Sequence, residues 1–425
     1  MKLSTFLLSF LMVSAVFADT TPDKIYMSSI KTVQLFQQNN QESLPIIHLG
    51  SSELLELHFD DLDGYVKNFY YTFQLCNADG SVADVSPFDY IRGYQQQRLT
   101  QYRNSSISAT NYVHYQLLFP EQSCEPAMSG NYLLKVYVNG DTSQLAFTKR
   151  FYVLDPRFSV GAAIMQPFDN QLVRTHQKLQ FSISTNQENV FNPQQQVQVK
   201  VMQNYRWDNM LSNLQPSFIR GNVLEYNGEQ DCLMEGGKEY RWADLRSFRF
   251  ESDRVARVDR TRQVYTVYMK PDFVRSNQRY MSMKDYNGWY NISATESINP
   301  WWQSDYANVV FTFIPPNNRP IEGNDVYLMG EITGNALTPE ALMQFNDEKG
   351  VYEKTLFLKQ GYYDYTYVTA PSGNTKAAGD VTLTDGNNWE TENDYVIFVY
   401  YRSLSDRYDE LVAISTVNSR NLTGL

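Results

Sequence analysis

The chain has 425 residues, more than one hydrophobic core usually serves, so two or three domains are expected. Its net charge of −11 argues against a general nucleic-acid binder and against electrostatic docking on anionic lipid, because both need a basic surface. Tyrosine and phenylalanine are abundant, at 31 and 24 residues against 4 histidines, and aromatic side chains favour strands.

The first eighteen residues have the pattern of a secretory signal peptide. A lysine precedes a largely apolar run from Phe6 to Phe17, and Ala18 is the small residue at the expected cleavage site. The run is shorter than the ~20 apolar residues of a membrane-spanning helix, and no later stretch is long and apolar enough. Asp19 offers no thiol for lipid attachment. We expect residues 1–18 to be removed and the exported chain not to insert directly into a membrane.

Residues 19–155 show short strand patterns separated by turns. Ser52–Phe59 roughly alternates apolar and polar residues, and Asn68–Leu75 is a tyrosine- and phenylalanine-rich strand. Asn139-Gly140 is a strong hairpin signal, because both residues tolerate positive φ. With almost no helical periodicity, this region is predicted to be an N-terminal β-sandwich of immunoglobulin-like type.

Residues 156–319 are less regular and predict a central β-rich domain. Gln177–Thr185 and Gln195–Gln203 read as strands, and Asp208–Leu214 as one short helical turn. The run Pro315–Pro320 resists ladder formation and predicts a stiff linker.

Residues 320–425 hold the clearest hairpin of the chain and predict a C-terminal β-sandwich with a polar tail. Tyr352–Lys359 and Tyr362–Thr369 alternate apolar and polar residues on either side of Gln360-Gly361. The expected fold class is therefore all-β, with β-sandwich domains in tandem.

No catalytic or metal-binding pattern stands out. There is no nucleophile elbow, phosphate loop or Cys-x-x-Cys, and the acidic turn Asp60–Gly64 lacks the glutamate that closes a calcium loop. The histidines are scattered and form no pair at helical ligand spacing: His48, His58, His114 and His176. We expect no enzyme, no metal, no cofactor and no small-molecule substrate, with an unrecognised hydrolytic carboxylate pair as a remote alternative.

Three cysteines are too few for a disulfide framework. In an oxidising compartment Cys76 and Cys124 could bridge, since both fall in the first third of the chain. All three cysteines, with Cys232, could equally remain unpaired thiols.

Two aromatic segments are candidate partner-binding sites. Arg206, Trp207 and Asp208 follow a strand, and Arg and Trp are the residues most enriched at interface hot spots. The alternative is that Trp207 is a core residue and Arg206 pairs with a carboxylate. Trp301 and Trp302 are adjacent, so they cannot both face one side of a strand, and at least one is expected to be exposed or to cover a domain junction.

Seven arginines gather in a short stretch of this acidic chain: Arg241, Arg246, Arg249, Arg254, Arg257, Arg260 and Arg262. Four acidic residues are interleaved with them, so a solvated face is one interpretation and a docking surface for an acidic partner is the other.

The order of several segments makes the chain resemble a known family. These segments are Phe69–Asp79, Thr110–Tyr115, Ser129–Tyr137, Arg206–Asn209, Gly236–Arg241, Leu358–Tyr363 and Glu390–Tyr395. Together they resemble the plug-protein family of the Bacteroidetes type IX secretion system across nearly the whole mature chain, although Leu75 stands where relatives tend to have histidine.

The resemblance implies a periplasmic protein at the inner face of the outer membrane. Its partner would be the outer-membrane translocon barrel, which it would bind and occlude when no substrate is in transit, preserving the permeability barrier. The family is not known for catalysis.

The C-terminal domain also looks like an early-set sandwich of the glycogen-binding type, through Val326–Gly330, Tyr352–Leu356 and Gly361–Tyr365. Sugar-binding versions carry an indole after the first strand, where Ile332–Ala336 has no aromatic residue. Because Trp389 has no assigned role, a carbohydrate-binding module protein is the alternative function.

Overall fold

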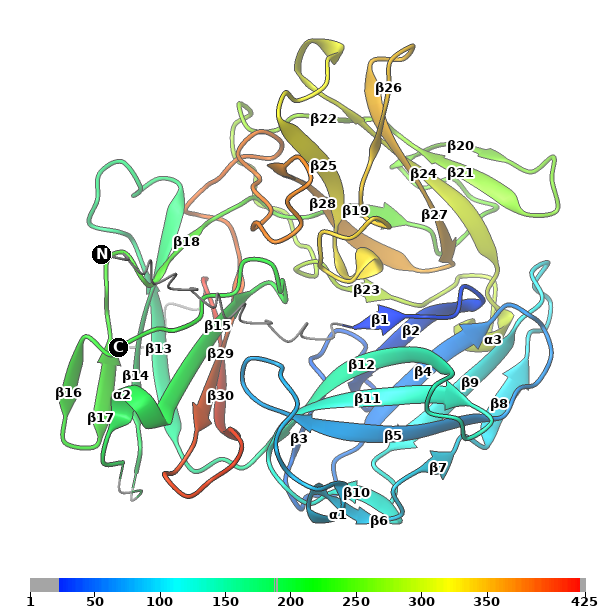
Figure 1. The fold of residues 1–425 in the computed structure, drawn as a ribbon. Coiled ribbons are helices and arrows are strands. Elements are labelled where there is room, and N and C mark those ends of the chain that lie inside the picture. The colour runs from blue at the N-terminus through cyan, green and yellow to red at the C-terminus, as the bar shows by residue number, and fades with distance from the viewer. Residues whose placement is uncertain (1–22, 187, 189, 421–425) are drawn as a thin grey trace, which may run out of the picture.

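The computed structural model describes residues 23–420 apart from 187 and 189, so the expected signal peptide at residues 1–18 lies outside the described residues. The described chain forms three two-layered β-sandwiches joined by loops and a few single helical turns (Figure 1). This confirms the expected all-β class built from β-sandwich domains.

The first sandwich packs a sheet of order β1-β12-β11-β5-β7, with β3 on β12, against a sheet of order β2-β4-β9-β8, and β6 pairs with β10 at its edge. Its strands are β1 Lys24–Ile25, β2 Ile30–Gln37, β3 Ile46–His48, β4 Leu55–Asp61, β5 Phe69–Cys76, β6 Ile91–Gly93, β7 Gln97–Arg98, β8 Gln101–Asn104, β9 Val113–Phe119, β10 Cys124–Pro126, β11 Gly130–Val138 and β12 Leu145–Leu154, with the helical turn α1 Pro87–Tyr90.

Alternation in the sequence explains this core. Phe69, Tyr71, Phe73 and Leu75 of β5 all point inward and are fully or almost fully buried, while the residues between them are partly exposed. The turn Asn139-Gly140 joins β11 to β12 with φ of 56° and 74°, the positive values that the hairpin signal requires.

The second sandwich is built from two distant parts of the chain. One sheet has the order β13-β14-β17-β16 with β18 on β14, and the other has the order β15-β29-β30. Its elements are β13 Ser159–Met165, β14 His176–Ser184, α2 Pro193–Gln196, β15 Val197–Gln203, β16 Phe218–Arg220, β17 Val223–Tyr226, β18 Leu233–Glu235, β29 Asp394–Tyr401 and β30 Glu410–Asn418. In Figure 1 the red C-terminal strands lie beside green β15.

The third sandwich is inserted between these two parts. One sheet has the order β20-β21-β24-β27-β26, with β22 on β24, and β28 pairs with β19, β23 and β25 in the facing layer. Its elements are β19 Arg241–Asp244, β20 Val255–Asp259, β21 Tyr265–Met269, β22 Asp272–Phe273, β23 Tyr290–Asn291, α3 Pro300–Gln303, β24 Tyr306–Ile314, η1 Pro316–Asn318, β25 Asn324–Met329, η2 Glu331–Thr333, β26 Gln344–Asn346, β27 Val351–Lys359 and β28 Tyr362–Pro371.

The expected division into a central domain at 156–319 and a C-terminal domain at 320–425 is therefore wrong. β24 and β25 flank the proline run, yet both contribute to one core, so Pro315–Pro320 is a loop within a domain. The expected helical turn at Asp208–Leu214 is also wrong, because Leu211 forms an isolated antiparallel bridge with Val201 of β15. Alternation reveals that a strand has a buried face, but not which sheet it joins.

The first and second sandwiches pack together through the outer faces of their sheets. Tyr152 and Leu154 of β12 bury against Phe398 and Tyr400 of β29 and Leu411 of β30. Backbone hydrogen bonds from Asp155 to Leu411, at 3.0 Å, and from Phe158 to Val412, at 3.1 Å, tie the segment that joins the two sandwiches to β30. Burial of this apolar area favours a fixed arrangement of the two sandwiches.

Candidate functional site at the domain junctions

The Arg206–Asp208 segment lies where the sandwiches meet. The Arg206 side chain is buried, and its guanidinium donates to both oxygens of Asp208, at 3.0 and 2.6 Å, and to the Gly379 carbonyl at 2.8 Å. The Trp207 ring packs beneath the Arg150 guanidinium of β12, 3.8 Å from the ring centroid. Arg206 thus pairs with a carboxylate and Trp207 belongs to a packed cluster, the structural alternative raised from the sequence.

The Trp301-Trp302 pair occupies the junction between the first and third sandwiches. Trp301 stacks on His58 of β4 with ring centroids 3.8 Å apart and nearly parallel planes. The Trp302 carbonyl accepts a hydrogen bond from the Ser106 backbone at 2.9 Å. Both tryptophans are partly buried, and their rings contact His58 and His114 of the first sandwich.

Beneath Trp301 lies a buried ionic cluster that links the same two sandwiches. Asp60 of β4 accepts from Lys359 of β27 at 2.5 Å, from Tyr306 of β24 at 2.5 Å and from His114 of β9 at 2.7 Å. Asp60 and Lys359 have no exposed surface. A buried charge needs a partner of opposite charge. At this junction the Asp60 carboxylate of the first sandwich and the Lys359 ammonium of the third neutralise each other.

The protonation states of the cluster follow from burial and charge. Burial favours protonation of Asp60, but the adjacent Lys359 charge and the His114 hydrogen bond outweigh it and hold the pKa of Asp60 below its ordinary value. Burial lowers the pKa of His114 to about 4 despite the nearby carboxylate. At neutral pH the cluster is therefore an Asp60–Lys359 ion pair flanked by a neutral imidazole.

The cysteines are free and buried, so the possible Cys76–Cys124 disulfide is not formed. Burial raises the pKa of the Cys76 thiol to about 11 and that of Cys124 to about 12. Cys76 ends β5 and Cys124 begins β10, which pairs with β6 rather than with β5. Both thiols pack as small apolar groups.

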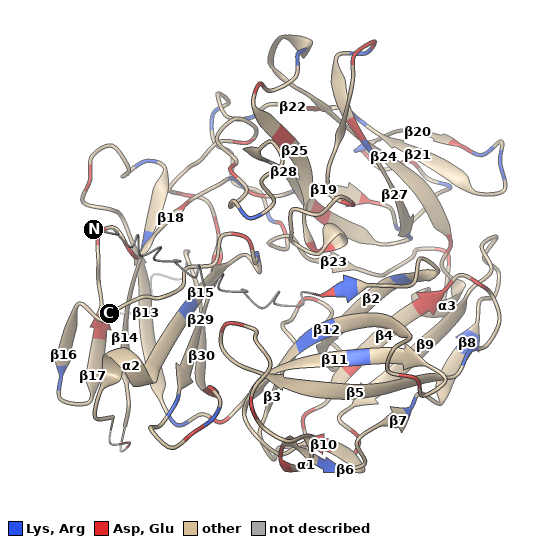
Figure 2. Cartoon of the chain, in the orientation of Figure 1, with Lys and Arg blue, Asp and Glu red and all other residues tan. Residues whose placement is uncertain are grey.

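The arginine run is largely engaged within the third sandwich. Arg241 binds Asp272 at 2.8 Å and Asp385 at 2.5 Å, and Arg254 also binds Asp272. Arg260 donates to backbone carbonyls and Arg257 lies over the Tyr268 ring. Arg246 pairs with Asp244 at 2.6 Å. On the β20–β21 hairpin of Figure 2, basic and acidic segments lie close together. Much of the charge is thus neutralised locally.

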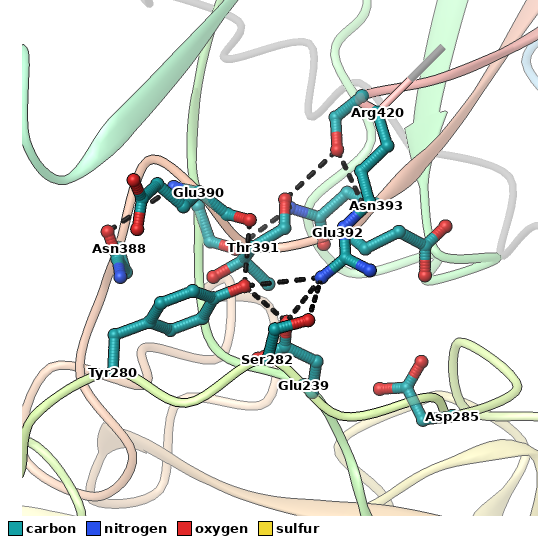
Figure 3. A network of polar contacts seen from close by, with 12 residues as sticks. Glu239, Tyr280, Ser282, Asp285, Asn388, Glu390, Thr391, Glu392, Asn393 and Arg420 are labelled. Carbon is teal, nitrogen blue, oxygen red and sulfur yellow. Dashed lines mark hydrogen bonds and ion pairs between the residues drawn. The ribbon is translucent and has the colours of Figure 1, made fainter.

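A polar network links the two segments of the chain that run between the second and third sandwiches, one leaving the second sandwich after β18 and one returning to it before β29 (Figure 3). Glu239, which is buried, accepts from Arg420 at 3.3 Å and contacts the Tyr280 hydroxyl, which also lies 2.7 Å from the Glu390 carbonyl. The Thr391 hydroxyl donates to the Gly237 carbonyl at 2.8 Å. The outgoing and returning segments are therefore held side by side.

A pocket of about 440 Å³ opens next to this network, where all three sandwiches meet. Glu42 comes from the first sandwich, Tyr205 and Glu392 from the second, and Asp285 from a loop of the third. Burial raises the pKa of Asp285 to about 7. Sequence reasoning missed this pocket, because its lining residues are far apart in the chain and form no motif.

Trp389, which kept a sugar-binding role open, packs partly buried against the core of the second sandwich. Among the described residues there is no cluster of His, Cys, Asp and Glu side chains that could hold a metal ion. In the described part of the chain no helix has the length and apolar character needed to cross a membrane.

Comparison with known proteins identifies the first sandwich. The family model "Type 9 secretion system plug protein 1st domain" matches residues 30–155. The crystal structure of a hypothetical protein from Parabacteroides merdae is similar to this one, with a TM-score of 0.89 and 31% sequence identity, over 93% of this chain and 99% of that chain. No curated protein matches the chain significantly.

Proposed function

The chain belongs to the type 9 secretion system plug protein family, and from that premise we propose that it plugs the outer-membrane translocon barrel of that system. It would bind the periplasmic mouth of the barrel and occlude it when no substrate is in transit. The outer membrane would thereby keep its permeability barrier during idle periods.

The observation that carries this proposal is the plug-family match over the first sandwich. The architecture supports it, because a plug must hold its shape against an open pore. The buried Asp60–Lys359 pair joins the first and third sandwiches, and the Arg206–Asp208 segment joins the second to its neighbours. Such junctions favour one compact body over a flexible string of domains.

The plug family is not an enzyme family, and we propose a role without catalysis or cofactor. A plug of this kind works in the periplasm, at the inner face of the outer membrane, and reaches that surface through a protein partner. The net charge of −11 fits this mode of attachment, since it disfavours direct docking on anionic lipid.

Deleting the gene tests occlusion directly. The proposal predicts that cells without this protein admit large antibiotics that the intact outer membrane excludes, and that the full-length gene restores exclusion. If the deletion leaves permeability to large antibiotics unchanged while the translocon is present, the occlusion role is wrong.

A further inference from the structure

We propose that the pocket at the three-sandwich junction binds a lysine or arginine side chain of a partner protein. The inference rests on the proposed function, since that partner would then belong to the secretion machinery, and it adds the chemistry by which the partner is recognised.

The pocket wall carries two neighbouring carboxylates without a cation. The Asn418 amide donates to Glu392 and to Asp394, the latter at 2.8 Å, and the Asn287 amide donates to the same two groups at 3.3 and 3.1 Å. Sharing two donors places the carboxylates side by side. In the described residues neither forms an ion pair with Lys, Arg or His, although two adjacent negative charges repel each other.

A buried acceptor beside them also lacks a partner. Asn287 is only 6% exposed and lines the pocket, and its Oδ1 receives no hydrogen bond in the described structure. An unsatisfied buried acceptor costs free energy unless a ligand supplies a donor. The pocket therefore favours a group that donates several hydrogen bonds and carries positive charge, because it offers acceptor oxygens from Asn287, Glu392 and Asp394. Ammonium and guanidinium groups do both.

The remaining wall suits an organic cation. Tyr205 and Trp289 form an aromatic corner with ring centroids 4.6 Å apart, and Tyr286 lines the same pocket. Aromatic faces attract ammonium and guanidinium groups through the ring quadrupole and do not ligate metal ions. The pocket volume lies within the range of about 300–1,000 Å³ that is usual for ligand sites.

The chain's own cations leave the site open. Arg420 lines the pocket, but its guanidinium turns to Glu239 and Ser282, while Figure 3 shows the Glu392 carboxylate pointing away from it, toward the side where Asp285 lies. Lys284 is exposed at the rim and forms no ion pair within the described residues. A partner's cation can displace it without breaking a buried contact.

The test uses a blocked peptide of three Arg-Gly repeats, titrated calorimetrically into the mature chain, with a peptide carrying Gln for Arg as its match. We expect the arginine peptide to bind at least tenfold more tightly than the glutamine peptide. Glu392→Gln/Asp394→Asn should weaken its binding at least tenfold, because both charge-assisted contacts are lost. The control Asp347→Asn/Glu348→Gln removes two exposed carboxylates of the β26–β27 loop and should leave affinity unchanged.

A second variant keeps the test independent of folding. Lys284→Ala alters only an exposed rim residue and should tighten peptide binding severalfold by removing the competing cation. The pocket assignment is overturned if the wild-type chain does not bind the arginine peptide, or if the control loses as much affinity as the Glu392/Asp394 variant.

The same variants separate this inference from the plug proposal. If the Glu392/Asp394 variant loses peptide affinity and is recovered with the translocon less often than the control, both ideas are supported. If the variant loses peptide affinity but is recovered with the translocon as well as the wild type, the plug proposal stands and the assignment of the pocket to a partner in the secretion machinery fails.

Discussion

Replacing Lys359 by Met should destabilise the junction between the first and third sandwiches severely. The ammonium group has no exposed surface and lies 2.5 Å from the equally buried Asp60 carboxylate. Met preserves the length and apolar stem of the side chain but leaves the carboxylate without its cation. Removing one partner of a buried ion pair costs about 3–5 kcal/mol, because the remaining charge stays desolvated.

The measurement is equilibrium unfolding in urea of the mature wild-type and variant chains, in a double-mutant cycle. Asp60→Asn should also be costly, since it leaves a buried ammonium without an anion. The combined Asp60→Asn/Lys359→Met chain should lose less stability than the sum of the two single losses, by about 2 kcal/mol or more. Lys354→Met is the control on the same strand, and it should change stability by no more than about 0.5 kcal/mol, because Lys354 is partly exposed.

Two results would refute this reasoning. One is a Lys359→Met chain that loses less than about 1 kcal/mol, which would mean that the ion pair contributes little. The other is a double variant whose loss equals the sum of the single losses, which would mean that Asp60 and Lys359 act independently.

Three further predictions concern pH, backbone space and thiols. Because burial lowers the folded-state pKa of His114 to about 4, below an unfolded value of about 6.5, its stabilising contribution is complete above pH 6.5 and declines as the pH falls toward 4. Between pH 7 and pH 4 this contribution to the free energy of unfolding falls by about 3 kcal/mol. Urea unfolding at the two pH values should therefore show a smaller fall in stability for His114→Asn than for the wild type. In thermal unfolding, Gly236→Ala should cost about 3 kcal/mol, since a Cβ there would lie 2.1 Å from the Asn388 carbonyl oxygen. Gly237→Ala should cost about 1 kcal/mol, because its Cβ would meet open space and only its φ of 60° is unfavourable. Equal losses would contradict the close packing of the two segments that run between the second and third sandwiches. A thiol-reactive dye should label three cysteines per unfolded chain without reductant and essentially none in the native chain. One labelled cysteine per unfolded chain would instead show that two of the three form a disulfide.

The sequence allowed the strands to be predicted more reliably than their pairing. Asn139-Gly140 and the hairpin around Gln360-Gly361 were both predicted from local turn chemistry, which a few residues determine. The assignment of β29 to the second sandwich was not predictable, because its partner β15 lies almost two hundred residues earlier. Inserting one sandwich into another leaves no local signal in either.

The candidate residues show the same limit. Arg206 and Trp301 were recognised as unusual, but the sequence could not distinguish a surface for a partner from a junction within the chain. The answer depends on which groups lie opposite, Asp208 and Gly379 for the guanidinium and His58 for the indole. The pocket beside Glu392 could not be predicted from the sequence for the same reason, since its walls come from three sandwiches.

Cross-linking of the tagged protein in native outer membranes, followed by pull-down and identification of the attached proteins, tests the central claim most directly. The account predicts that the outer-membrane translocon barrel is the main cross-linked partner in cells where secretion is idle, and that its recovery falls when substrate occupies the pore. Failure to recover the barrel under any secretion state would contradict the plug assignment.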